Sequence, residues 1–139
     1  MKNKGFTLIE LLAVIIVLAI IMVLTIPNVL GTMDKAKKES LNVYAKKVLN
    51  QAQRFTSEKE VLGDVVLEGR YSLEDIGLID HGIYKGEVYI FPGDTSRYLI
   101  TITDGTYCIL NQNIDGINDI NNITKKNSND SCDKIIISE

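Results

Sequence analysis

The chain has 139 residues, of which 45% are hydrophobic and 24% are charged, with a formal net charge of −3. This length allows one small domain, and the net negative charge argues against a nucleic-acid-binding protein, which usually carries a basic surface. One histidine and two cysteines exclude an ordinary zinc site built from four such ligands. The apolar residues are not spread evenly, because residues 6–26 hold one charge and the remainder of the chain is distinctly polar. This distribution indicates a membrane-inserted chain with a small polar head.

Residues 6–26 read FTLIELLAVIIVLAIIMVLTI, with Glu10 as their one charged residue. A helix of this length spans roughly 30 Å, the thickness of the hydrocarbon core of a bilayer. The alternative is a buried core helix, but a small polar head could hardly surround a helix that is apolar on every face. A cleaved secretory signal fits poorly, because its apolar region is shorter and ends at a small-residue cleavage site. Lys2 and Lys4 favour a cytoplasmic N-terminus.

Glu10 is the residue in this span that requires an explanation. A carboxylate within a membrane helix is costly and is a functional hypothesis by default, although near the interface it can also reach water or protonate. The sequence Lys4-Gly5-Phe6-Thr7-Leu8-Ile9-Glu10, followed by the apolar stretch, resembles the N-terminus of type IV prepilins and the related pseudopilins.

The resemblance implies a set of processing and assembly residues. Residues 1–5 correspond to the leader of a class III signal peptide, which a prepilin peptidase removes by cleavage between Gly5 and Phe6. The same enzyme usually methylates the new amine of Phe6. Glu10 matches the acidic position that family members use for assembly, and Pro27 matches a helix-kinking proline.

Physical chemistry agrees with these implied roles. Cleavage after Gly5 would create a positive amine on Phe6, and Glu10 lies four residues further along the same helix face. In a filament, the Glu10 carboxylate of one subunit can pair with the Phe6 amine of its neighbour. Two opposite charges in a medium of low dielectric are strongly favoured over two isolated charges, so this pair can set the stagger between subunits. Apolar helices exchange lipid for protein at little hydrophobic gain, so packing and the charge pair must set the register.

The span continues into an amphipathic segment. A kink is expected at Pro27, because proline lacks the helical N–H donor and crowds the preceding turn. Apolar positions beyond it share one stripe and predict a single helix over residues 6–56. A heptad coiled coil is the alternative, but the repeat is short. The residues of the stripe are Leu41, Tyr44, Val48, Ala52 and Phe55.

The predicted head, residues 57–139, is a small antiparallel sheet on the apolar stripe, an α+β fold. Residues 57–85 are expected to connect the helix to the sheet, with a one- or two-turn helix over 72–79. Alternating Val, Ile, Tyr and Thr predict strands, and Asp104-Gly105 is the strongest hairpin signal. The expected strands are 87–91, 97–103, 106–110 and 134–138, with a turn at 92–94. Pilins likewise place a sheet on the far half of a long helix.

Cys108 and Cys132 bracket a segment rich in Asn, Asp and Ser, which is expected to be an exposed loop. A disulfide is permitted on the exported side of the membrane, and two unpaired thiols are the alternative. In pilins a disulfide often bounds a C-terminal surface loop, and the positions of Cys108 and Cys132 match that pattern.

Weaker signals lie in the same segment. Asn111, Asn113 and Asp115, followed by Gly116, copy the first half of a calcium-binding loop. The twelfth position is Asn122 rather than glutamate, so a solvated turn is the favoured interpretation and no cofactor is expected. Asn122 and Asn129 begin glycosylation sequons of a kind that arises easily by chance. His81 is assigned no chemistry.

The sequence therefore predicts a structural subunit and not an enzyme. The resemblance implies a precursor in the cytoplasmic membrane that self-associates, with other pilins and an assembly platform, into a type IV pilus-class surface filament. A pseudopilin of a type II secretion or DNA-uptake system shares the same N-terminus and is the first alternative. An uncleaved, single-pass membrane protein with a ligand-binding head is the second. No direct nucleic-acid binding is expected.

Overall fold

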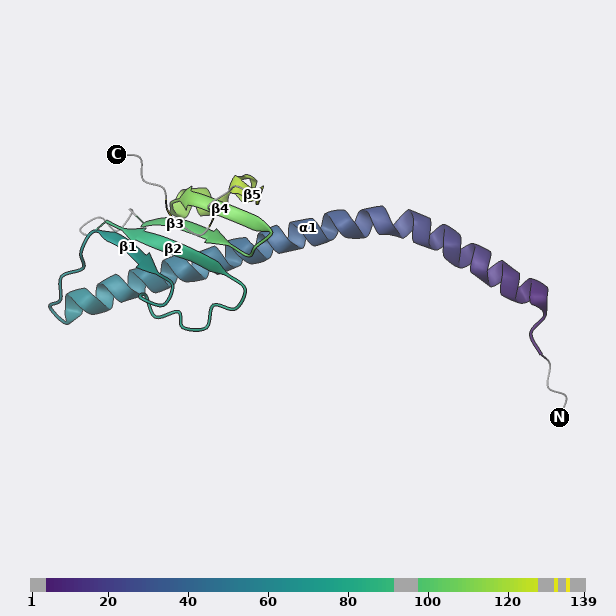
Figure 1. Cartoon of the computed structure of the whole chain (residues 1–139), viewed down its shortest axis with the longest axis horizontal. Helices are drawn as coiled ribbons and strands as arrows, with labels where there is room; N and C mark the ends of the chain where they lie inside the picture. The colour runs from purple at the N-terminus through teal and green to yellow at the C-terminus, as the bar shows by residue number, and fades with distance from the viewer. Residues whose placement is uncertain (1–4, 92–97, 128–131, 133–134, 136–139) are drawn as a thin grey trace. The chain divides into compact units, whose positions relative to one another are not determined.

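A computed structural model describes residues 5–91 and 98–127, together with Cys132 and Ile135; the side chains of residues 27 and 28 are outside this description. The chain divides into two compact units, one ending at Ala36 and the other beginning at Lys37. The first unit is helical over its described length from Leu8 onward. The second holds the remainder of the same helix and the whole sheet (Figure 1).

The helix α1 runs from Leu8 to Val61. It begins two residues later and ends five residues later than the helix expected over 6–56. Its extra C-terminal turns include Glu58, Lys59 and Glu60, polar residues that are good helix formers. A left-handed Gly63, with φ of 78°, follows its last turn, and glycine adopts that conformation without steric cost.

The sheet is a five-stranded antiparallel meander in the order β1-β2-β3-β4-β5. Its strands are β1 (Gly69–Ser72), β2 (Lys85–Ile90), β3 (Tyr98–Thr103), β4 (Tyr107–Gln112) and β5 (Ile123–Lys125). The hairpin expected at Asp104-Gly105 is confirmed: the Asp104 carboxylate accepts hydrogen bonds from the backbone N–H groups of Thr106 and Tyr107, both at 2.7 Å. Gly105 has φ of 89° there. The α+β class is thus confirmed.

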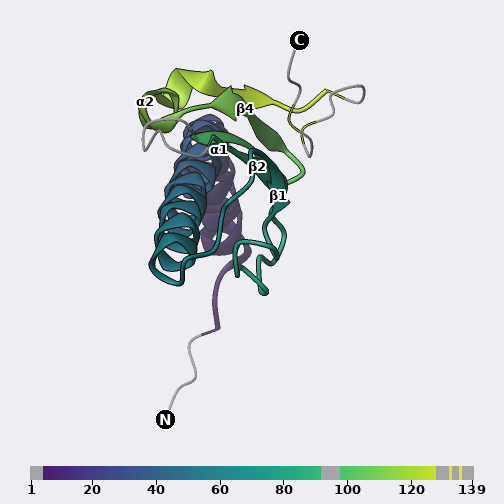
Figure 2. The same cartoon turned by 90° about the vertical axis from the view of Figure 1, so that its left-hand side faces the viewer.

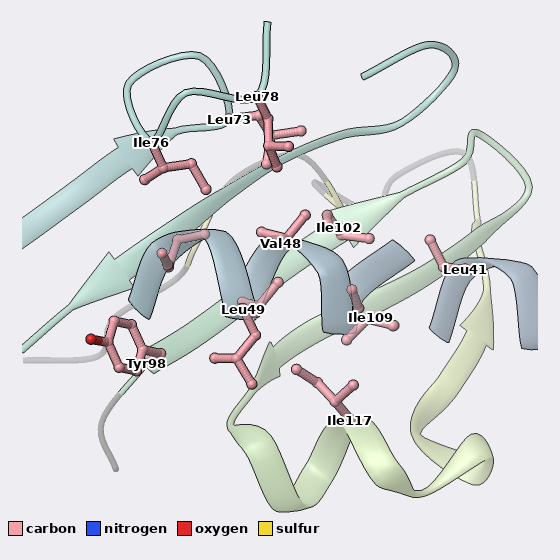
Figure 3. Close-up of a cluster of buried hydrophobic side chains, with 14 of the residues drawn as sticks. Leu41, Val48, Leu49, Leu73, Ile76, Leu78, Tyr98, Ile102, Ile109 and Ile117 are labelled. Carbon is pink, nitrogen blue, oxygen red and sulfur yellow. The ribbon is translucent and has the colours of Figure 1, made fainter. Parts of the chain in front are cut away.

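The core lies between the second half of α1 and one face of the sheet (Figure 2). The predicted stripe is confirmed, because Leu41, Val48 and Ala52 are fully buried and Tyr44 and Phe55 pack against the core. In Figure 3 the helix residues Leu41, Val48 and Leu49 lie among sheet residues such as Ile102 and Ile109. Close packing of this kind makes each buried methylene contribute to stability.

The segment expected to be only a connection contains an element that the sequence prediction missed. β1 pairs with β2 along its full length, from Gly69 opposite Ile90 to Ser72 opposite Glu87. The short helix expected over residues 72–79 is wrong: Ser72 ends β1, residues 73–77 form a turn, and residues 78 and 79 are irregular. The capping interaction that the sequence suggested between Ser72 and Asp75 nevertheless forms. The Asp75 carboxylate accepts from the Ser72 N–H, and the Ser72 hydroxyl oxygen accepts from the Asp75 N–H. A cap can form without helix when tertiary packing sets the next residues.

The segment between the cysteines is also more ordered than expected. It holds α2 (Ile114–Asn118), a 3-10 turn (Ile120–Asn122) and β5, and it buries Ile117 and Ile123. The expected exposure holds for most of the described residues of this segment, but the expected loop is wrong, because short regular elements form there and two isoleucines reach the core. The strand expected over 134–138 and the turn over 92–94 lie outside the described residues, apart from Ile135, which is buried without strand structure.

Cys108 and Cys132 form a disulfide, as the sequence predicted. Their Cα atoms are 5.8 Å apart, within the usual range for a bridge. Cys108 lies on β4, so the bond ties the last part of the chain to an inner strand of the sheet. Both half-cystines are buried.

Candidate processing and assembly site

Thr7 and Glu10 form a reciprocal cap at the start of α1. The Thr7 backbone N–H donates to Oε2 of Glu10 at 2.9 Å, and the Glu10 N–H donates to the Thr7 hydroxyl oxygen at 3.4 Å. This is a capping box, in which a Thr and a Glu three residues later satisfy two backbone donors that the helix leaves open. Sequence reasoning missed this role of Glu10, although Thr-x-x-Glu before an apolar run is its signal.

The Gly5–Phe6 peptide bond precedes the cap and lies outside the helix. Both residues have irregular backbone, and the Phe6 side chain is 87% exposed. A peptidase binds its substrate as extended chain, so a bond in non-helical backbone next to a helix start is open to cleavage. The capping box uses only Thr7 and Glu10 and therefore survives the loss of residues 1–5.

The first half of α1 presents apolar side chains on every face. From Leu8 to Met33 its large hydrophobic residues are half or more exposed. α1 contains a segment long and apolar enough to cross a membrane, and no part of that segment is buried by the described residues. The Thr25 hydroxyl group in this segment is satisfied within the helix, because Thr25 Oγ1 donates to the Ile21 carbonyl oxygen at 2.9 Å. Such a surface requires lipid or other helices around it.

Pro27 lies within α1, and the helix continues through it. Its side chain is outside the described set, so the kink expected at Pro27 stays a prediction.

Two of the three residues proposed for calcium, Asn111 and Asn113, are engaged in other contacts. The Asn113 side chain caps α2 by accepting from the Gly116 N–H at 2.9 Å. Asn111 sits at a bulge in β4 with φ of 46°, and its side-chain oxygen accepts from the Thr101 hydroxyl at 3.0 Å. Asp115 lies in the first turn of α2. Across the portion of the chain that the structure describes, no cluster of three His, Cys, Asp or Glu side chains could hold a metal.

His81 has a structural role that the sequence did not reveal. Its Nδ1 lies 2.8 Å from the Tyr84 carbonyl oxygen, and its Nε2 lies 2.9 Å from Glu74 Oε1. Both partners are acceptors, so the doubly protonated imidazolium satisfies them best. The hydrogen bond to Glu74 and that to Tyr84 raise the pKa of His81, while the bond to His81 lowers the pKa of Glu74.

Comparison with known proteins bears on the N-terminal site. The model of the prokaryotic N-terminal methylation motif matches residues 1–26. The chain is 28% identical over 111 residues to the type IV wide pilus major component PilA4 of Thermus thermophilus, covering 79% of this chain and 74% of that protein. This is a type IV pilin-like chain. No solved structure gave a significant match.

The matched segment of the pilin-like chain contains Gly5, Phe6 and the Thr7–Glu10 cap, and it ends within the exposed apolar half of α1. The residues that match the methylation motif therefore include those that form the cap and the start of the exposed apolar span. The similarity to PilA4 extends well beyond this segment, since it covers most of the chain.

Proposed function

We propose that this chain is a structural subunit of a type IV pilus-class filament. The observation that carries the proposal is the unburied apolar half of α1, which begins at a capping box whose first residue, Thr7, directly follows the Gly5–Phe6 bond. In the precursor this half spans the cytoplasmic membrane. In the filament, displayed at the cell surface, it packs against the same helix of neighbouring subunits. The named relative, a major pilus component, supports a pilus over a pseudopilin.

Processing prepares Glu10 for assembly. Removal of residues 1–5 by a prepilin peptidase leaves a positive amine on Phe6, which the enzyme then methylates. The Glu10 carboxylate has two oxygens and several acceptor positions, so Oε2 can keep the Thr7 N–H while the carboxylate accepts from the Phe6 amine of another subunit. The pair neutralises two charges that would be costly in an apolar surrounding. It thereby favours one stagger between helices over all others.

Intact-mass measurement and N-terminal sequencing of the membrane-extracted protein test this proposal. The expected mature chain begins at Phe6 and is heavier by one methyl group. The same extraction from cells without the prepilin peptidase serves as the control and should yield the chain with residues 1–5. A chain that still begins at Met1 in peptidase-containing cells would refute the proposal and favour an uncleaved membrane protein. Long sheared filaments containing the mature chain would separate a pilin from a pseudopilin.

A further inference from the structure

The loop between β1 and β2, residues 73–84, is held to the head in two different ways. Its first half is anchored in the core by three buried apolar side chains, Leu73, Ile76 and Leu78 (Figure 3). Its second half, residues 79–84, is called the latch segment here. The large aliphatic side chains of the latch segment, Ile79 and Ile83, are 84% and 69% exposed. The latch segment is therefore held by polar and ring contacts and not by aliphatic packing.

His81 closes the latch segment. Its Nδ1 lies 2.8 Å from the Tyr84 carbonyl oxygen and its Nε2 lies 2.9 Å from Glu74 Oε1. The Tyr84 N–H donates back to the His81 carbonyl oxygen at 3.1 Å, which makes a tight turn. Both side-chain partners of His81 are acceptors, so the ring donates to both only when both of its nitrogens carry a proton. The charged ring thus joins the end of the loop to its start.

Loss of the proton breaks one of these two bonds. A neutral imidazole has one N–H and one lone pair, and a lone pair cannot face a carboxylate oxygen at hydrogen-bond distance. The bond to Tyr84 belongs to the turn, whereas the Glu74 side chain is 61% exposed and can turn to water. The Glu74 bond is therefore the one that is lost. It is also the largest cause of the raised pKa of His81, so it is complete below 6.5 and disappears as pH rises through the raised value.

The charged groups around His81 come from the loop, from β2 and from α1. Two acids of the loop favour the charged ring, and a lysine of β2 that lines the same small cavity opposes it. On α1 a lysine lies beside the tyrosine against which the latch segment packs. These groups are Glu74 and Asp80 on the loop, Lys85 on β2, and Lys47 beside Tyr44 on α1. Glu74 is the acid that bonds directly to the ring, so it dominates the response of the latch segment to pH.

The closed latch segment carries a cost at Tyr44. The Tyr84 ring stacks on the Tyr44 ring at 3.8 Å between centroids, with 10° between the ring planes. The Tyr44 hydroxyl oxygen is buried and has no hydrogen-bond partner within the described part of the chain. A buried polar group without a partner is costly, and hydration removes that cost. Movement of Tyr84 away from Tyr44 opens the ring to water, so opening gains hydration where closing gains the bond between His81 and Glu74.

We propose that the latch segment is a pH-sensitive switch, closed onto α1 while His81 bridges Glu74 and Tyr84 and opened locally, with Tyr84 leaving Tyr44, when His81 loses its proton. The rest of the head stays folded, because the buried anchors of the first half of the loop do not depend on His81. The two states differ by one hydrogen bond and one hydrated hydroxyl group, so a single proton can shift the balance between them. The switch belongs to the head alone and does not depend on the proposed function.

Amide hydrogen exchange of the full-length, detergent-solubilised chain tests the switch. Protection of residues 79–84, corrected for the intrinsic exchange rate, should fall about fivefold or more between about pH 5.5 and about pH 8.5, as expected for the loss of one hydrogen bond. Protection of β3 should change less than twofold, which verifies that the head stays folded. The chain has one histidine, so a single imidazole signal in an NMR titration reports its proton loss. The two transitions should coincide in pH.

Three variants separate the bridge from general effects of charge. Glu74→Gln has an amide that accepts from the charged ring or donates to the neutral one, so the bridge survives at both pH values and protection should differ less than twofold. Asp75→Asn is the matched control. It also removes an acid from the loop, but the Asp75 carboxylate binds Ser72 and not His81, so the wild-type response should persist. Tyr44→Phe removes the unpartnered hydroxyl group and should raise protection at about pH 8.5 at least twofold.

Each remaining outcome contradicts the switch. Protection of residues 79–84 that is independent of pH in the wild type would overturn it. A Glu74→Gln variant with the full wild-type response would show that the bridge is not its cause. A parallel loss of protection in β3 would show global unfolding in place of local opening. Unchanged protection in Tyr44→Phe would refute the role assigned to the buried hydroxyl group.

Discussion

Thr7 and Glu10 exchange hydrogen bonds at the start of α1, and the same carboxylate is the one charge within the apolar span. One side chain therefore serves the helix start and is available to a neighbouring subunit. These two roles differ in chemistry, because a cap needs an acceptor oxygen whereas an ion pair needs a charge.

Glu10→Gln separates the two roles. Glutamine retains a side-chain oxygen that caps the Thr7 N–H, but it cannot neutralise the Phe6 amine. We expect Glu10→Gln to leave membrane insertion and cleavage intact and to reduce sheared filaments at least about tenfold, which corresponds to about 1.4 kcal/mol. Glu10→Ala should lose both roles, and Glu10→Asp, which keeps the charge, serves as the control. Normal filament amounts with Glu10→Gln would refute the charge-pair mechanism.

The Cys108–Cys132 bridge should stabilise the head. The two cysteines are 24 residues apart in sequence, and closing such a loop contributes about 3–4 kcal/mol in the chain-entropy account. Replacing both cysteines by alanine should lower the free energy of unfolding by about that amount, measured by denaturant titration. Wild-type protein in reductant should behave like the double variant. Two free thiols in non-reducing peptide mass mapping would contradict the bridge.

The His81–Glu74 contact should make the stability of the head depend on pH, with a loss of stability at both higher and lower pH. The raised pKa of His81 means that its contribution is complete below the ordinary value of 6.5 and is lost as pH rises through the raised value. The lowered pKa of Glu74 means that its contribution is complete above 4.5 and is lost as pH falls through the lowered value. The contact therefore stabilises most between about pH 4.5 and 6.5.

Melting temperature measured against pH in wild type and in His81→Gln checks this expectation. The difference between the two proteins should be largest inside that window and should shrink above it as the imidazole loses its proton. The effect should be small, because Glu74 is exposed and water screens the pair. A difference that is constant across pH would show that His81 acts through packing alone.

Gly86 should not tolerate a side chain. It faces Ile102 across the β2–β3 pair, and an added Cβ would collide with the Thr101 carbonyl oxygen and approach the Ile102 Cα to 2.9 Å. Since both are backbone atoms of a central strand, Gly86→Ala should destabilise the head by roughly 1–3 kcal/mol. Gly69→Ala on β1 is the control, because nothing lies within 4 Å of its added Cβ. Equal unfolding midpoints for the two variants would contradict the expected clash.

Periodic and local features were predictable from the sequence. The stripe from Leu41 to Phe55 packs as expected because a helix places residues three and four apart on one face whatever covers it. The Asp104-Gly105 hairpin also forms as expected, because both of its turn residues act locally. The Asp104 carboxylate accepts from a backbone N–H group of the turn, and Gly105 adopts the positive φ that the turn requires. Elements that depend on a partner were missed. β1 has no clear alternation, and β5 is three residues long; each is a strand because a neighbouring strand offers its hydrogen-bonding edge.

The N-terminal segment was determined by the sequence itself. The segment combines an uninterrupted apolar span, a lone glutamate at its start and a Gly-Phe bond before it. These features can be recognised without tertiary contacts, because the described part of the chain does not bury the span. Only the tertiary structure decided which head residues stay exposed. Val61 and Leu62 are as apolar as Leu41 and Val48, yet they are 86% and 75% exposed whereas Leu41 and Val48 are fully buried. Burial depends on where another layer lies, and that position is a property of the folded chain.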